Sequence, residues 1–280
     1  MIIIDSQVHI WAPETPDKPY ATENASKPHR PEPLGHEELL REMAVAGVDR
    51  AIVVPPTWEG DRNDTSLEAA RLHPDRFAVM GRLPINQPSS RGRLAAWKNQ
   101  PGMLGIRITF RAGHSQNWLH DGTADWFWDE AERYDVPVMV FAPKAVPKLG
   151  EVAERHPGLR LIIDHMGLNS ELRGKPLGPA VDDVVKVARF PNVAVKVSGL
   201  PVYVAEPYPF PSLHPQIRRV VGAFGPKRCF WGTDLSHLPC PYRQAVTLFT
   251  EELDFLSESD KDWIIGRGIA EWLNWPLPKN

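Results

Sequence analysis

The chain begins with the stretch Ile2-Ile3-Ile4-Asp5-Ser6-Gln7-Val8-His9-Ile10-Trp11. Its apolar, β-branched start predicts a fully buried strand. Asp5, Gln7 and His9 follow at a spacing of two, which places their side chains on one face of a strand. In parallel α/β folds, ligands bind at the C-terminal ends of the strands. This stretch therefore predicts a central strand that carries part of a functional site at its end.

An apolar strand followed by a helix recurs along the rest of the chain. Predicted strands cover 50–55, 76–83, 103–109, 136–141, 159–165, 193–198 and 228–234, and predicted helices cover 36–46, 63–72, 90–98, 123–134, 146–155, 179–189, 212–224, 241–254 and 259–273. Eight units at this interval predict a (β/α)8 TIM barrel, an α/β fold, as a single domain over 1–280. An open doubly wound sheet is the alternative, and it is less favoured because no Gly-x-Gly-x-x-Gly loop follows a strand.

The composition limits the partners that this chain can have. A net charge of −3 over 280 residues, without a basic block, argues against nucleic acid, and no apolar run is long enough for a membrane span. Cys229 and Cys240 form neither a disulfide framework nor a zinc-ligand spacing, so we expect a cytoplasmic protein. A small molecule is the expected partner. The 10 tryptophans and 29 prolines are compatible with a homodimer.

Polar side chains follow several of the predicted strands at the point where each strand ends. They are Asp5, Gln7 and His9, then Arg107 and Thr109, Asp164 and His165, Lys196 and Ser198, and finally Asp234 with His237 nearby. In a barrel these strand ends share one cavity. Packing alone does not explain so many polar groups, because each would be costly to bury without a partner. The sequence therefore predicts one shared active site.

Three of these strand ends carry motifs that resemble a known family. The segments Asp-Ser-Gln-Val-His-Ile-Trp (5–11), Ile-Asp-His-Met-Gly (163–167) and Trp-Gly-Thr-Asp-Leu-Ser-His (231–237) are similar to the signature strands of the amidohydrolase-2 group of the amidohydrolase superfamily. The C-terminal stretch that begins at Ile264 is similar as well. This group contains sugar-acid lactonases, 2-pyrone-4,6-dicarboxylate lactonases and metal-dependent decarboxylases. The resemblance runs from the first strand to the last helix and implies a barrel hydrolase.

Two departures from the family pattern concern the metal site. Metal-binding members usually carry His-x-His or Glu-x-His on the first strand, where this chain has Gln7, and a histidine after the fifth strand, where residues 140–143 supply no ligand. His9 and Asp234 remain, with His165 nearby. Because a catalytic zinc site needs three strong protein ligands, we expect no metal and no other cofactor. A weakly bound divalent ion such as zinc or manganese is the alternative.

The pattern resembles that of the metal-independent 2-pyrone-4,6-dicarboxylate lactonases and of sugar lactonases, and the first resemblance implies a mechanism. Asp234 acts as general base on a water molecule, while His9 and His165 polarise the lactone carbonyl and stabilise the developing oxyanion. Opening of a lactone, a cyclic ester, is therefore the predicted reaction. Lactones suit a metal-free site because an alkoxide-type leaving group departs more readily than an amine.

The same resemblance assigns substrate contacts. Arg107 matches an arginine that holds a substrate carboxylate. The predicted substrate-binding residues are Gln7, Trp11, Arg107, Lys196, Tyr203 and His237. For Gln7 the alternative is a hydrogen bond to His9, and for Lys196 it is an ion pair inside the barrel. No arginine follows the strand at 193–198, and Arg111 is expected to lie too far away, so we expect a mono-acid or a neutral ring.

Two other functions remain open on the sequence. The first is a divalent-metal-dependent decarboxylase of an aromatic acid, in which Gln7 replaces the usual glutamate. The second is a barrel that binds a small molecule without catalysis.

Overall fold

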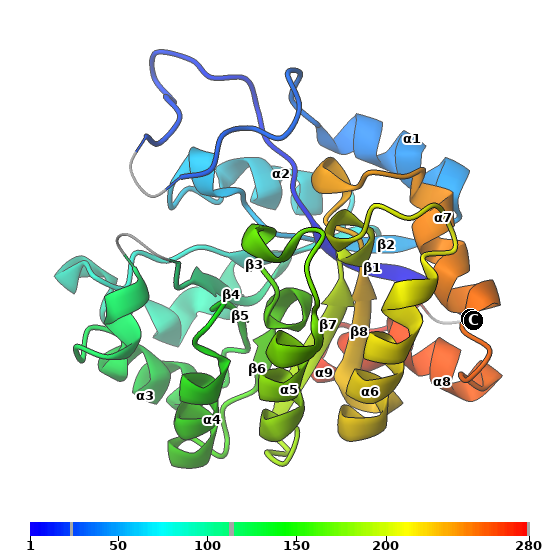
Figure 1. Cartoon of the computed structure of the whole chain (residues 1–280). Helices are drawn as coiled ribbons and strands as arrows, with labels where there is room; N and C mark the ends of the chain where they lie inside the picture. The colour runs from blue at the N-terminus through cyan, green and yellow to red at the C-terminus, as the bar shows by residue number, and fades with distance from the viewer. Residues whose placement is uncertain (23–24, 112–114, 279–280) are drawn as a thin grey trace.

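The computed structural model describes residues 1–22, 25–111 and 115–278. Its centre is an eight-stranded parallel sheet in which each strand pairs with the next one along the chain (Figure 1). The strands are β1 (Ile4–Val8), β2 (Arg50–Val53), β3 (Phe77–Gly81), β4 (Met103–Thr109), β5 (Val138–Phe141), β6 (Leu161–Ile163), β7 (Val193–Ser198) and β8 (Cys229–Gly232).

The last strand returns to the first, so that the sheet is nearly closed. The backbone N–H of Asp234, just after β8, donates to the carbonyl oxygen of Gln7 on β1 at 2.9 Å. The backbone N–H of Thr233 donates to Oδ1 of Asp5 at 2.9 Å. Consecutive strand order with this return is the topology of a (β/α)8 barrel. The barrel prediction is confirmed, and the doubly wound alternative is wrong.

Helices surround the strands (Figure 1). They are α1 (His36–Ala46), α2 (Asp64–Leu72), α3 (Asp125–Arg133), α4 (Val146–Arg155), α5 (Gly178–Val187), α6 (His214–Phe224), α7 (Tyr242–Thr247), α8 (Glu258–Asp262) and α9 (Gly268–Trp272). No helix in the described part of the chain is long and apolar enough to cross a membrane.

The helices differ from the prediction in two places. The segment predicted as a helix at 90–98 is a pair of 3₁₀ turns, Pro88–Ser90 and Arg93–Asn99, because Gly92 between them has a φ of +78° that no α-helix accepts. The predicted helices at 241–254 and 259–273 each contain a wide π-type turn, at Leu248–Glu252 and Trp263–Arg267. The second of these turns packs Gly266 so closely on the chain start that a Cβ there would lie 2.1 Å from the Ile2 carbonyl oxygen.

Apolar side chains fill the lower half of the barrel, at the amino ends of the strands. Polar side chains occupy the upper half, at the carboxyl ends. The inner layer consists of Ile4, Ile52, Ala78, Met80, Met139, Ile162, Ala194 and Phe230, all nearly or fully buried. Ile269 and Leu273, from α9 and the residue after it, close this layer from below. Because the bottom is sealed by apolar packing, the polar groups at the carboxyl ends of the strands have only the upper mouth to face.

Strand β1 contains a bulge that changes which way its polar residues point. Asp5 pairs with Ala51 and Val8 pairs with Val53. Between these two pairs β1 therefore contains one residue more than β2, which is a β-bulge. Gln7 therefore points into the barrel, whereas Asp5 accepts a hydrogen bond from the Tyr242 hydroxyl of the outer helix α7 at 2.7 Å. The prediction that Asp5 shares a face with Gln7 and His9 is wrong, because the extra residue breaks the alternation.

Candidate active site

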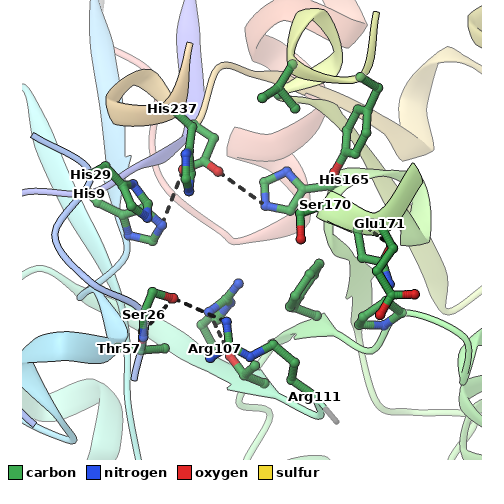
Figure 2. Close-up of a pocket in the computed structure, with 18 of the residues that line it drawn as sticks. His9, Ser26, His29, Thr57, Arg107, Arg111, His165, Ser170, Glu171 and His237 are labelled. Atoms are coloured by element: carbon green, nitrogen blue, oxygen red, sulfur yellow. Dashed lines mark hydrogen bonds and ion pairs between the residues drawn. The ribbon is translucent and has the colours of Figure 1, made fainter. Parts of the chain in front are cut away.

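A cavity of about 260 Å³ opens at the carboxyl ends of the strands (Figure 2). Six of the residues predicted as catalytic or substrate-binding line it: His9, Arg107, His165, Tyr203, Asp234 and His237. They come from β4 and from the segments after β1, β6, β7 and β8, as expected for a barrel site. The cavity therefore gathers residues that lie more than 200 positions apart in the sequence.

Asp234 lies between two histidines in this cavity. It follows β8 with a φ of +52°, a left-handed conformation that aspartate adopts more readily than most residues. Its Oδ1 lies 3.3 Å from Nε2 of His9, and its Oδ2 lies 3.9 Å from Nε2 of His165. Burial raises the pKa of Asp234, and His165 and Arg107 only partly offset this effect. A carboxylate with a raised pKa is a better proton acceptor than a free one.

His165 is the second histidine at this carboxylate. It follows β6 in a left-handed turn with Met166, and its Nδ1 lies 3.0 Å from the Ser198 hydroxyl at the end of β7, closer than the 3.4 Å to the Ser198 carbonyl oxygen. Burial lowers the pKa of His165, although Asp234 counteracts this, so the ring is neutral near pH 7. When Ser198 donates to Nδ1, the hydrogen of His165 lies on Nε2, which faces the cavity. His165 can then act as a hydrogen-bond donor there.

His9 has the opposite arrangement. Its Nδ1 lies 2.6 Å from the carbonyl oxygen of Val54, which can only accept, so Nδ1 carries a hydrogen. Burial, reinforced by Arg107 and His29, holds the pKa of His9 well below its usual value. The neutral ring therefore leaves Nε2 without a hydrogen, and Nε2 accepts from the Gln7 amide at 3.3 Å. The predicted role of His9 as a carbonyl-polarising donor lacks an N–H in this cavity.

A buried ion network lies beneath the cavity. Asp164 binds Lys196 through Oδ1 at 2.7 Å and Arg107 through Oδ2 at 3.0 Å. Burial alone would raise the pKa of Asp164, but Lys196 and Arg107 outweigh it and lower the pKa to about 2. Lys196 also donates to Oε1 of Gln7. This network connects β1, β4 and β7 with the residue that follows β6.

Three predicted substrate contacts lie outside the cavity lining. Gln7 and Lys196 are fully buried and bind each other, because they lie one layer deeper in the barrel than His9 and Ser198. The alternatives given for them, a hydrogen bond to His9 and an ion pair, are what the structure contains. Trp11 is also buried, and its ring packs edge-on against Trp58 at 5.1 Å. Trp58 lines the cavity in its place.

Three arginines line one side of the cavity. Arg107 is joined there by Arg111, whose Nη1 donates to Ser26 at 3.2 Å, and by Arg82, which directly follows β3 (Figure 2 shows the first two). Arg82 donates to the Pro55 carbonyl oxygen at 2.6 Å, and its buried Nη2 has no hydrogen-bond partner among the described residues. The expectation that Arg111 lies too far away is wrong. Arg82 was missed, although a charged residue at a predicted strand end was the available signal.

His29 also lines the cavity, and the sequence did not predict it as a site residue. It belongs to the long segment between β1 and α1. Its ring stacks on that of His237 with 3.3 Å between centroids, and its Nδ1 lies 2.8 Å from the Ser236 hydroxyl. Burial lowers the pKa of His29 to about 3 and that of His237 to about 4, so both rings are neutral near pH 7. The segment lacks any periodic pattern, so nothing in the sequence placed it over the cavity.

The donor atoms do not fit a tightly bound divalent metal. Within residues 1–22, 25–111 and 115–278, no three His, Cys, Asp or Glu side chains are arranged to hold a metal ion. Nε2 of His9 and Oδ1 of Asp234 are close together, but the oxygen of Gln7 is occupied by Lys196, and its amide nitrogen faces His9. Two protein ligands are fewer than the three of a catalytic zinc site.

Known proteins resemble this chain in sequence and in fold. The family model described as Amidohydrolase matches residues 4–274. The L-fucono-1,5-lactonase of Burkholderia ambifaria is 28% identical over 237 residues, which cover 82% of this chain and 79% of the relative. The 4-sulfomuconolactone hydrolase of Hydrogenophaga intermedia is 26% identical over 236 residues, covering 83% and 74%. Among solved structures, an amidohydrolase from Burkholderia multivorans with bound zinc has a TM-score of 0.82 and 20% identity, covering 99% and 100%.

Proposed function

Because this chain belongs to the amidohydrolase family and is a hydrolase that acts on ester bonds, we propose that it opens a small anionic lactone without a metal. The observation that carries the proposal is the position of Asp234. Its carboxylate lies in the cavity between His9 and His165, opposite a row of arginines. The two relatives named for lactones support the choice of a cyclic ester.

In the proposed mechanism, Asp234 takes a proton from a water molecule whose oxygen bonds to the lactone carbonyl carbon. The carbonyl oxygen becomes an oxyanion, and the Nε2–H of His165 donates to it, with the Ser198 hydroxyl holding the ring in that tautomer. The ring C–O bond then breaks, and the leaving oxygen takes the proton back from Asp234. The reaction uses water alone as co-reactant.

The arginine row supports an acidic substrate. Arg82, Arg107 and Arg111 are cations on one side of the cavity, and the Nη2 of Arg82 has no hydrogen-bond partner from the described chain. A carboxylate or another oxyanion would supply the missing acceptors through paired hydrogen bonds. Of the two expected substrates, a mono-acid and a neutral ring, we therefore keep the acid and drop the neutral ring, and the proposed lactone carries one or more anionic groups.

We expect Arg111→Ala to raise the KM for an acidic lactone about 10- to 100-fold with little change in kcat. The variant loses a charge-assisted hydrogen bond that contributes about 1.5–3 kcal/mol. Steady-state kinetics on a matched pair, an acidic lactone and its methyl ester, measure the effect. Arg189→Ala, on the exposed outer surface, is the control. An equal KM of wild type and Arg111→Ala for the acidic lactone would contradict the assignment.

We expect activity to survive removal of divalent metals. Purified protein should contain far less than one equivalent of zinc or manganese, and dialysis against a chelator should leave kcat/KM unchanged within about twofold. Elemental analysis paired with activity assays makes the measurement. If the chelator abolished activity and one equivalent of zinc or manganese restored it, the metal-free mechanism would be wrong.

A substrate screen tests the reaction class. Lactones and aromatic acids are incubated with the enzyme, and acid release and CO₂ release are followed in parallel. Acid release from acidic lactones is the expected result. Release of CO₂ from an aromatic acid identifies a decarboxylase instead, and binding without turnover of either class identifies a non-catalytic barrel.

A further inference from the structure

Lys196 fixes the orientation of a neighbouring amide. Its ammonium group has three hydrogens and no acceptor, and its partners are Oδ1 of Asp164 at 2.7 Å, Sδ of Met139 at 3.2 Å and Oε1 of Gln7. Lys196 and Gln7 are both fully buried, so water does not compete for these contacts. With its oxygen held by Lys196, the amide of Gln7 can present only its NH₂ group to His9, 3.3 Å away.

We propose that Lys196, acting through Gln7, keeps Nε2 of His9 free of hydrogen, so that His9 and Asp234 form one proton-accepting pair. This rests on the lactone hydrolysis proposed above. Two contacts determine the state of the ring: Nδ1 donates to the Val54 carbonyl, and Nε2 accepts from Gln7. Lys196 and Gln7 are thus positioning residues, and neither touches the cavity.

The carboxylate of Asp234 faces the bare nitrogen directly. Its Oδ1 lies 3.3 Å from Nε2 of His9 and receives no hydrogen bond from the described residues. Two acceptors at this distance lack a proton between them. When Asp234 takes the proton from the attacking water, its new O–H can donate to His9. A hydrogen bond to the protonated form raises the pKa of a carboxyl group, so this contact makes Asp234 a stronger base.

The charges around the pair favour a neutral His9. The charged and titratable groups that face His9 or Asp234 are Arg82 after β3, Arg107 on β4, Asp164 and His165 after β6, Lys196 on β7, and His29 and Tyr203 on the cavity wall. Arg82 and Arg107 repel a second positive charge on the imidazole. The proton therefore stays on the carboxyl group until the leaving oxygen takes it as the ring C–O bond breaks, which balances the step.

Gln7→Glu is the discriminating variant. One oxygen of the new carboxylate keeps the contact with Lys196, and the other replaces the amide nitrogen that faces His9. Such an acceptor needs an N–H, so His9 takes up a proton at Nε2 while Nδ1 keeps its own. We expect kcat to fall roughly 10- to 100-fold with little change in KM, and the acid limb of the kcat profile to move about one pH unit lower.

Long-range ¹H–¹⁵N NMR of histidine-labelled protein reads the tautomer itself. Between pH 6 and 8 we expect wild-type His9 to carry hydrogen on Nδ1 only, and His9 of Gln7→Glu to carry hydrogen on both nitrogens. His214, whose Nε2 lies 2.8 Å from the Pro209 carbonyl outside the cavity, is the internal reference. Gln216→Glu, on α6, adds the same charge away from Lys196 and should change neither the His9 signals nor kcat.

The outcomes separate this inference from the function on which it rests. A hydrogen on Nε2 of wild-type His9 would overturn the inference even if the enzyme opens lactones. A kcat and acid limb in Gln7→Glu equal to those of wild type would also overturn it. If His9 has the expected tautomer but no acidic lactone is hydrolysed, the proposed function fails while the arrangement of the pair stands.

Discussion

Asp234→Asn is expected to lower kcat for lactone opening roughly 10²- to 10⁴-fold, the usual contribution of a general base. The amide has nearly the same shape as the carboxylate but cannot accept the proton of water. Asparagine also tolerates the left-handed backbone of this position, whose φ is +52°. We therefore expect KM and the melting temperature to change little. Steady-state kinetics with thermal unfolding as a companion measurement test this.

Asp254→Asn is the control for that experiment, because the side chain of Asp254 is 89% exposed and lies outside the cavity. It should behave as wild type. If Asp234→Asn opened acidic lactones at the wild-type rate, another group would have to activate the water, and the proposed mechanism would be wrong.

Asp164→Asn is expected to destabilise the protein by about 3–5 kcal/mol, since it removes the counter-charge of two buried cations. Asp164 is fully buried between Lys196 and Arg107, and the amide leaves both positive charges without compensation. Equilibrium unfolding in urea near pH 7 measures the change in the free energy of unfolding. A change below about 1 kcal/mol would mean that the ion network contributes little to stability.

The matched control is Asp183→Asn on α5, which removes the partner of Lys186 in an exposed ion pair. It should cost less than about 0.5 kcal/mol. The pH dependence gives a second signature of Asp164. Because its pKa is lowered to about 2 in the folded state, its contribution is complete above about pH 4 and is lost as the pH falls towards 2. Asp164→Asn should lack that part of the acid sensitivity.

The fold was predictable because each strand carries its own local signal. Eight short, mostly apolar runs alternate with amphipathic segments, and all eight predicted strands overlap observed ones. The bulge in β1 was not predictable from this pattern. Ser6 and Gln7 are both polar, so the sequence does not reveal which of them departs from the alternation; pairing with β2 decides it.

The site was only partly predictable, because position along a strand does not give depth in a barrel. Asp234, His165 and Arg107 line the cavity as their strand-end positions suggested. Lys196 and Gln7 occupy similar positions but lie one layer below, where side-chain length and ion pairing decide what they touch. Site residues on loops are harder still to predict, because contacts with residues distant in sequence decide where a loop lies.

The wall formed by the segment between β1 and α1 has an evolutionary consequence. Ser26 and His29 of this segment line the cavity, whereas Asp234 and His165 lie directly after β8 and β6. In the proposed hydrolysis, this part of the cavity wall and the two groups assigned to the chemical step therefore come from different segments of the chain. Insertions and exchanges in this segment can alter which ring the enzyme admits while the proton-transfer groups keep their places. Relatives that share the barrel can therefore differ in substrate while they keep the same hydrolytic groups.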